Sequence, residues 1–282
     1  ITLVLTLGSA SIGWLIERSA LHTHGVLQSV AVLALVAGLA SALAAKSLEQ
    51  SVLNVIAALP CEQGGDLSAA RQQLSWIVGR DTTSLSRDEI LRATAETASE
   101  NAVDGLFAPL FWMLVGATLW SFGLTDAPGP LALAWGFKAA STLDSMLGYR
   151  RGKLRWLGTA GARLDDLLTW LPCRLVMLSL PLVSRPWRQW PALVRLAESD
   201  GQHDASPNAG RSEAIYAHCA GVQLGGRNRY GDRWVEKPLL GADKPNADPR
   251  GISRILELTR RLELIWILMA AMLSWCLQAR AQ

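Results

Sequence analysis

The chain has 282 residues, of which 50% are hydrophobic and 18% are charged, against roughly 25% charged residues in ordinary soluble proteins. Its net charge of +3 and the lack of a basic stripe argue against a nucleic-acid partner. The four cysteines form no CxxC pair, so neither a disulfide framework nor a zinc site is expected. Twelve tryptophans fit a membrane protein, because indole rings favour membrane interfaces.

Several apolar segments are candidate membrane-spanning helices. Residues 1–16 resemble part of a membrane helix, so we expect a truncated N-terminus. Residues 26–45 carry no charge, and about 20 helical residues cross a hydrocarbon core of about 30 Å. A buried helix of a soluble protein is the alternative for this segment. Further candidate spans are 107–124, 167–183 and 264–277, whereas 131–147 carries charges and could instead line a polar cavity.

Two polar regions separate these segments. Residues 46–106 are predicted to be mostly helical, and the capping-box pattern Ser86-Arg-Asp-Glu89 predicts a helix start. Residues 184–261 are rich in Gly, Pro, Asn and Asp, which predicts loops around a few short helices. Strand-like alternation does not persist anywhere. We therefore predict a mainly α, multi-pass helical membrane protein with loop-rich polar regions, forming a single domain over residues 1–282.

Charged residues cluster three times at the mouth of an apolar segment. Glu96, Glu100 and Asp104 are spaced four residues apart, so a helix would place them on one face. Like charges repel, and acids near hydrocarbon are costly, so a cation should lie among them. That cation could be a metal ion, a Lys or Arg, or a substrate amine. The other two clusters combine acids and bases in the same way: Lys138 with Asp144, and Arg163 with Asp165 and Asp166.

These charges suit a site for phosphates and Mg²⁺. Mg²⁺ takes oxygen ligands and is often shared with substrate phosphates, which makes four aspartates candidate ligands: Asp104, Asp144, Asp165 and Asp166. Four cations could neutralise phosphate or carboxylate groups: Arg80, Lys138, Arg163 and Arg174. A salt-bridge network that only holds polar helix ends together explains the same residues equally well.

Two glycine-containing segments could bind phosphate through backbone N–H groups. Residues 221–231 include Gly225 and Gly226 and could cradle an anion, although a plain surface loop is the alternative. The turn from Ser206 to Gly210 precedes a helix predicted to start near Arg211, and helix N-termini attract anions.

A series of short motifs occurs in a fixed order over residues 46–260. They include Val78-Gly-Arg-Asp-Thr82, Glu96-Thr-Ala-Ser-Glu-Asn101, Val103-Asp-Gly105, Thr142-Leu-Asp-Ser-Met146, Gly148-Tyr149, Ala162-Arg-Leu-Asp-Asp166, Ser206-Pro-Asn-Ala-Gly210, Leu224-Gly-Gly226 and Lys237-Pro238. Together they resemble the CobD/CbiB family, the adenosylcobinamide-phosphate synthases of cobalamin biosynthesis. The GDP and HPV-like motifs with which that family usually begins are absent here, which fits the expected truncation.

The resemblance implies a multi-pass protein of the cell membrane that joins 1-amino-2-propanol, or its phosphate, to adenosylcobyric acid. Forming an amide from a free carboxylate is uphill in water, so ATP and Mg²⁺ are the expected cofactors. The expected partners are the corrinoid and amine substrates, the lipid bilayer and other late membrane proteins of the pathway. A non-catalytic, AmpE-like signalling relative is the alternative, and such a protein should have lost the charged set.

Within the matched motifs we assign three groups of site residues. The catalytic candidates are Glu96, Glu100, Asn101, Asp104, Lys138 and Asp144. The candidates for binding substrate or phosphate are Arg80, Asp81, Arg163, Arg174, Ser206, Asn208, Gly225 and Gly226. The candidate metal ligands are Asp104, Asp165 and Asp166.

Overall fold

The computed structural model describes residues 1–62, 64–147, 155–184, 187–230 and 233–281, so the motif residues Gly148 and Tyr149 lie outside the described residues. Helices make up 74% of the chain, which confirms the mainly α class. The chain forms two compact units, each built from separated segments. Unit 1 consists of Ile1–Ala44, Asp104–Pro172 and Ile265–Gln282. Unit 2 consists of Ala45–Val103 and Cys173–Leu264, and so combines most of both predicted polar regions.

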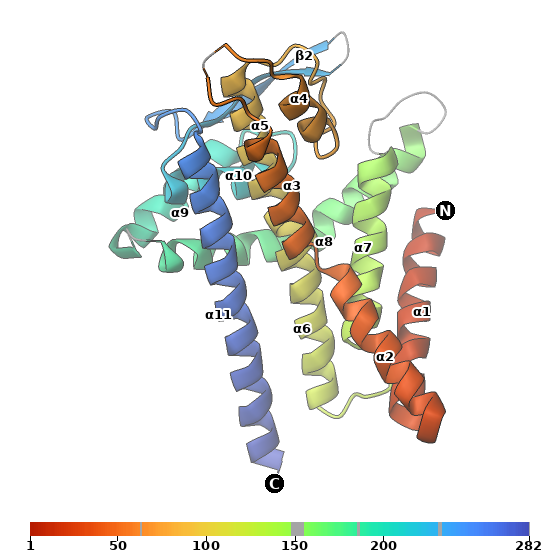
Figure 1. Ribbon diagram of the computed structural model, residues 1–282. Coiled ribbons are helices and arrows are strands. Elements are labelled where there is room, and N and C mark those ends of the chain that lie inside the picture. Colours follow the sequence, from red (N-terminus) through yellow and green to blue (C-terminus); the bar gives the residue numbers. More distant parts are fainter. Residues whose placement is uncertain (63, 148–154, 185–186, 231–232, 282) are drawn as a thin grey trace. The chain divides into compact units, whose positions relative to one another are not determined.

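Unit 1 is built from helices that pack along their lengths (Figure 1). Helix α1 (Thr2–His22) packs against α2 (Gly25–Ala42) and α7 (Pro130–Leu147), and α7 also packs against α6 (Ala108–Ser121). Gly13 permits the close approach of α1 to α7, because a Cβ atom there would lie 2.9 Å from the Ala132 Cα. Small residues at such crossings let two helix backbones approach closely.

Three segments are long and apolar enough to cross a membrane: Gly25–Ala57, Arg87–Ser121 and Gly158–Val183. They overlap the predicted spans 26–45, 107–124 and 167–183 but have different bounds. The predicted span 264–277 belongs to α11 (Pro249–Ala281) and lies partly outside the residues whose side chains are described. Apolar side chains of α2 point away from the protein interior, and Val26 and Leu33 are 83% and 70% exposed. A contiguous exposed apolar face of this kind is typical of a lipid-facing helix.

Unit 2 is organised around α5 (Arg87–Ala102), which contacts α3 (Ala45–Ala57), α4 (Ser68–Ser75) and α10 (Ala209–Ala220). Helix α9 (Trp190–Gly201) packs against α10. The predicted capping box begins α5: the Glu89 N–H donates to Ser86 Oγ at 3.3 Å, and the Ser86 N–H donates to Glu89 Oε2 at 2.8 Å. Two longer helices complete the chain: α8 (Arg155–Val183) and α11.

A two-stranded antiparallel sheet occupies part of the region that was predicted as loops. Strand β1 (Leu224–Tyr230) pairs with β2 (Arg233–Leu240), with Gly226 opposite Lys237 and a register shift between Leu224 and Gly226. The loop prediction was wrong for these residues because β1 carries Gly, Arg and Asn where apolar residues usually mark a strand, and β2 contains Pro238, which is uncommon within strands. Gly225 has φ +81°, and a Cβ atom there would lie 1.9 Å from the Pro238 oxygen, so this bulge requires glycine.

Candidate functional site

Glu96 lies in the interior of unit 2, with only 1% of its surface exposed. A buried carboxylate is costly unless it is paired and hydrogen-bonded, and Glu96 meets both conditions. Its Oε2 accepts a hydrogen bond from the Arg80 guanidinium, and its Oε1 accepts one from the Gly225 N–H at 2.9 Å. Arg92, one helical turn earlier on α5, lies 3.5 Å from Oε1. Glu96 therefore ties α5 to the bulge of the hairpin.

The same two arginines hold the hairpin against α5. Arg80 donates to Asn228 Oδ1 at 2.7 Å, and Arg92 donates to the backbone oxygens of Gly225 and, at 2.9 Å, Arg227. The Gly225 amide, which the sequence predicted to cradle phosphate, is thus already bonded to a protein carboxylate. This arrangement fixes the position of β2 and of the side chains that it carries.

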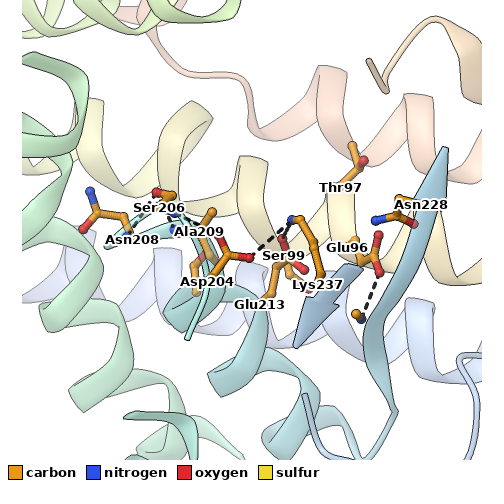
Figure 2. A network of polar contacts seen from close by, with 12 residues as sticks. Glu96, Thr97, Ser99, Asp204, Ser206, Asn208, Ala209, Glu213, Asn228 and Lys237 are labelled. Carbon is orange, nitrogen blue, oxygen red and sulfur yellow. Dashed lines mark hydrogen bonds and ion pairs between the residues drawn. The ribbon is translucent and has the colours of Figure 1, made fainter. Parts of the chain in front are cut away.

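Lys237 of β2 projects between Glu213 of α10 and Asp204 of the preceding turn (Figure 2). Its Nζ lies 3.0 Å from Glu213 Oε1 and 3.8 Å from Asp204 Oδ2. Burial alone would lower the pKa of Lys237, but Glu213, Glu100, Asp204 and Glu96 together raise the pKa above its usual value. Lys237 is therefore a permanent cation among carboxylates.

Glu213 is fully buried, and only one of its two carboxylate oxygens has a hydrogen-bond partner among the described residues. Burial raises its pKa to about 8; Lys237 opposes that rise, whereas Glu96 and Glu100 add to it. Its second oxygen, Oε2, has no hydrogen-bond partner among the described residues, and the same holds for the Asn228 side-chain nitrogen. Buried polar atoms are almost always paired in native proteins, so each of these two atoms is a candidate contact for a bound group.

A second cluster of polar residues surrounds the start of α10. Ser206 Oγ accepts hydrogen bonds from the backbone N–H groups of Asn208 and Ala209, both at 3.2 Å (Figure 2). Arg174 donates to Asn208 Oδ1 at 2.5 Å and to the Pro207 oxygen at 3.0 Å. Arg211 donates to the same Pro207 oxygen at 2.9 Å, so two guanidinium groups lie side by side. Adjacent guanidinium groups attract an anion, and the Glu198 carboxylate already binds Arg211, whose Nε donates to Glu198 Oε2 at 2.8 Å.

Comparison with known proteins identifies the family. Residues 1–259 match the model of the family described as CobD/Cbib protein. The chain is 44% identical over 280 residues to "Cobalamin biosynthesis protein CobD" of Synechocystis sp., covering 99% of this chain and 77% of that protein. The chain belongs to the CobD/CbiB family. It is also 40% identical over 234 residues to "Cobalamin biosynthesis protein CobD" of Yersinia enterocolitica, covering 82% of this chain and 68% of that protein.

Other CobD/CbiB relatives extend further beyond the aligned region. "Cobalamin biosynthesis protein CbiB" of Salmonella typhi is 41% identical over 217 residues, which cover 76% of this chain and 62% of that protein. The aligned parts thus span between about three fifths and three quarters of these relatives' lengths. No solved structure matches the chain.

The structure distributes the residues predicted from the CobD/CbiB motifs over both units. Unit 2 contains Arg80, Asp81, Glu96, Glu100, Asn101, Arg174, Ser206, Asn208, Gly225 and Gly226. Unit 1 contains Asp104, Lys138, Asp144, Arg163, Asp165 and Asp166. The predicted α-helical face of Glu96, Glu100 and Asp104 is interrupted, because α5 ends at Ala102 and Asp104 belongs to the π-helical turn η1 (Val103–Phe107).

Some predicted residues have close partners within their own unit. Lys138 interacts electrostatically with Asp104 and Asp165. Asp81 accepts a hydrogen bond from the Thr83 N–H at 2.9 Å, and the exposed Asn101 donates to the Thr97 oxygen at 3.1 Å. Among the described residues, no group of three or more His, Cys, Asp or Glu side chains is arranged to hold a metal ion.

Sequence reasoning missed several members of the buried cluster: Arg92, Asp204, Glu213, Asn228 and Lys237. It searched the mouths of apolar segments, whereas these residues lie within the polar regions. Lys237 belongs to a matched CobD/CbiB motif, and Glu213 follows another by three residues, so their place in the family pattern was the available signal.

Proposed function

We propose that the protein acts in cobalamin biosynthesis as an ATP-dependent, amide-forming ligase. It joins 1-amino-2-propanol, or its phosphate, to adenosylcobyric acid and gives adenosylcobinamide or its phosphate. Membership of the CobD/CbiB family and the relatives' names support the pathway. The observation that carries the reaction type is the buried cluster of carboxylates around Lys237 in unit 2, because a non-catalytic relative has no need to maintain it.

The reaction needs two kinds of binding group, and unit 2 contains both. Activation of the acid through an acyl phosphate requires cations near phosphate oxygens, and Arg174 with Arg211 could supply them. The amine donor is an ammonium ion at neutral pH and requires carboxylates, which Glu100 and Glu213 could supply. Positioned charges of this kind commonly make the largest contribution to catalysis.

Mg²⁺ remains part of the proposal, with Asp104, Asp165 and Asp166 as its ligands. These residues form no preformed cage among the described side chains. Mg²⁺ usually keeps several waters and is bound through one or two carboxylates together with substrate phosphates, so a cage is not required. When bound with ATP, the ion would neutralise negative charge on the transferred phosphoryl group.

We also propose that the protein is a multi-pass protein of the cell membrane. Three segments with the length and hydropathy of membrane spans support this location. Alkaline carbonate washing of membranes tests it, and the protein should stay in the pellet. Recovery of folded protein in the wash without detergent would contradict the membrane location.

Genetic complementation tests the pathway assignment. A cobalamin auxotroph that lacks only this step should grow without added corrinoid product when it expresses the full-length protein. The same strain without the gene should grow only when adenosylcobinamide is supplied, which verifies that the later steps work. Lack of growth despite normal protein levels in the membrane fraction would contradict the proposed function.

A further inference from the structure

With every acid ionised, the buried cluster of unit 2 would have one more negative charge than positive charges. Its carboxylates are Glu96, Glu100, Asp204 and Glu213, and its cations are Arg80, Arg92 and Lys237. Arg80 and Arg92 are both committed to Glu96, which leaves Lys237 alone among the other three acids. An uncompensated charge in a protein interior is expensive, and the pKa of Glu213 is raised to about 8 by burial, so near neutral pH a proton offsets the surplus. A bound cation can take the place of that proton and leave Glu213 ionised.

A second, independent observation locates that cation. Glu213 Oε2 is buried and has no hydrogen-bond partner among the described residues, whereas Oε1 of the same carboxylate is bonded to Lys237. Glu213 itself is 0% exposed, so solvent does not satisfy this oxygen from the surface. Five members of the cluster are partly exposed, namely Arg80, Arg92, Glu100, Asp204 and Lys237, whereas Glu96 and Glu213 are buried.

The chemistry of the cluster selects the class of ligand. A phosphate or carboxylate would be repelled by the surplus of negative charge. A divalent metal ion would bring two positive charges next to the Lys237 ammonium, whereas the fully ionised cluster has a surplus of one negative charge. An ammonium group carries one positive charge and three N–H donors, which match one surplus charge and an unpaired acceptor.

We propose that Glu213, together with Glu100, binds the ammonium group of a small primary amine and that Glu213 then removes its proton. This inference rests on the proposed function and names the residues that receive its amine substrate. Lys237 holds Glu213 Oε1 in place and also lies 3.8 Å from Asp204 Oδ2 (Figure 2). Arg80 and Glu96 are further charged groups that act on Glu213.

The chemical step balances with the acyl phosphate that ATP would supply. One proton passes from the ammonium nitrogen to Glu213 Oε2, which leaves a neutral amine and a carboxylic acid. The amine lone pair then forms a bond to the acyl carbon, and the bond from that carbon to the phosphate oxygen breaks with its electron pair. The second nitrogen proton leaves with the phosphate as hydrogen phosphate, and the amide is formed.

The environment of Glu213 suits a base of this kind. Burial raises its pKa to about 8, with Glu96 and Glu100 acting in the same direction and Lys237 acting against them. A general base works best when its pKa lies near the operating pH and near that of the proton donor. A carboxylate with an ordinary pKa would leave the amine protonated for most of the time.

Two different acceptors of the acyl group distinguish removal of the amine proton from activation of the corrinoid acid by ATP. The purified full-length enzyme is given ATP, the corrinoid acid and either the alkylamine donor or hydroxylamine, which is largely unprotonated at neutral pH. Glu213→Gln should slow amide formation on the order of a hundredfold or more, whereas hydroxamate formation should stay within about twofold of wild type. Glu236→Gln, on the exposed side of the same strand, is the matched control and should change neither product.

The other possible results for Glu213→Gln and for the wild-type enzyme decide between two kinds of failure. Equal loss of amide and hydroxamate in Glu213→Gln, or no loss of either, would overturn the assignment of Glu213. A melting temperature near that of wild type shows that the variant is folded, and Glu100→Gln should raise KM for the alkylamine without affecting hydroxamate formation. If wild-type enzyme makes neither product, the proposed function itself is wrong, and this result is distinct from failure of the Glu213 assignment.

Discussion

Both units of the protein bury glutamates, but Glu17 of unit 1 and Glu213 of unit 2 are satisfied in opposite ways. Glu17 of α1 accepts backbone N–H groups from Gly129, Leu131 and Ala132 at 3.0, 2.6 and 3.2 Å, at the start of α7. Glu213 accepts only from Lys237 and has an unpaired oxygen among the described residues. Burial alone therefore does not distinguish a structural acid from a functional one, whereas the state of its hydrogen bonds does.

The partners explain this difference. A helix N-terminus offers unsatisfied N–H groups and a positive dipole, so a carboxylate placed there is stabilised without any ligand. Glu17 takes this role for α7 of unit 1. Glu213 lies on a helix whose first turn is already capped by Ser206, and it faces other acids instead of N–H donors. Its negative charge is therefore offset by a proton below about pH 8, or by an added cation.

The largest loss of stability is expected where a satisfied acid of unit 2 loses its partner. Arg80→Met would leave Glu96 without its main ion pair, and breaking a buried pair typically costs about 3–5 kcal/mol. The control is Arg229→Met, because Arg229 is 39% exposed and lies 3.9 Å from Asp81. Denaturant unfolding of the detergent-solubilised protein measures both. Equal, small effects would contradict the structural importance of the Glu96 network.

Glu17→Gln should destabilise unit 1 by about 2–3 kcal/mol, because the amide nitrogen cannot accept the N–H groups of α7. Asp126→Asn in the same unit serves as the control, since the Asp126 side chain is 96% exposed and pairs with Arg18 at the protein surface. Thermal unfolding of both variants provides the comparison. A Glu17→Gln melting temperature equal to that of the control would mean that the cap contributes nothing.

The sequence predicted the helical class, the separation into apolar and polar regions and the start of α5 at Ser86, because these depend on local pattern. It also placed Glu96 and Arg80 among the site residues. It could not predict that Gly225, 129 residues away, would donate to Glu96. Nor could it predict the hairpin, whose polar strands are stabilised by Arg80 and Arg92 of unit 2 instead of by an apolar face. Such long-range pairing determines which acids end up unpaired.

The smallest effect on stability is expected for Glu213→Gln, with a loss below about 1 kcal/mol at pH 7. The loss is small because Lys237 still has the carboxylates of Asp204 and Glu100 as neighbours in the variant. The variant should differ from wild type in how its free energy of unfolding depends on pH. The folded pKa of about 8 lies above the reference value of 4.5, so wild-type stability from this group is complete below pH 4.5 and is lost as the pH rises through 8. Unfolding measured from pH 4.5 to 8 should show a flatter profile for Glu213→Gln. An unchanged profile would contradict the unusual surroundings of Glu213.

Coupled turnover tests the central claim most directly. The purified full-length protein should release ADP continuously only when the corrinoid acid and the alkylamine are both present, and mass spectrometry should find one new amide for each ADP. Either ATP turnover of equal rate without the corrinoid acid, or no turnover with both substrates and Mg²⁺ present, would contradict the account.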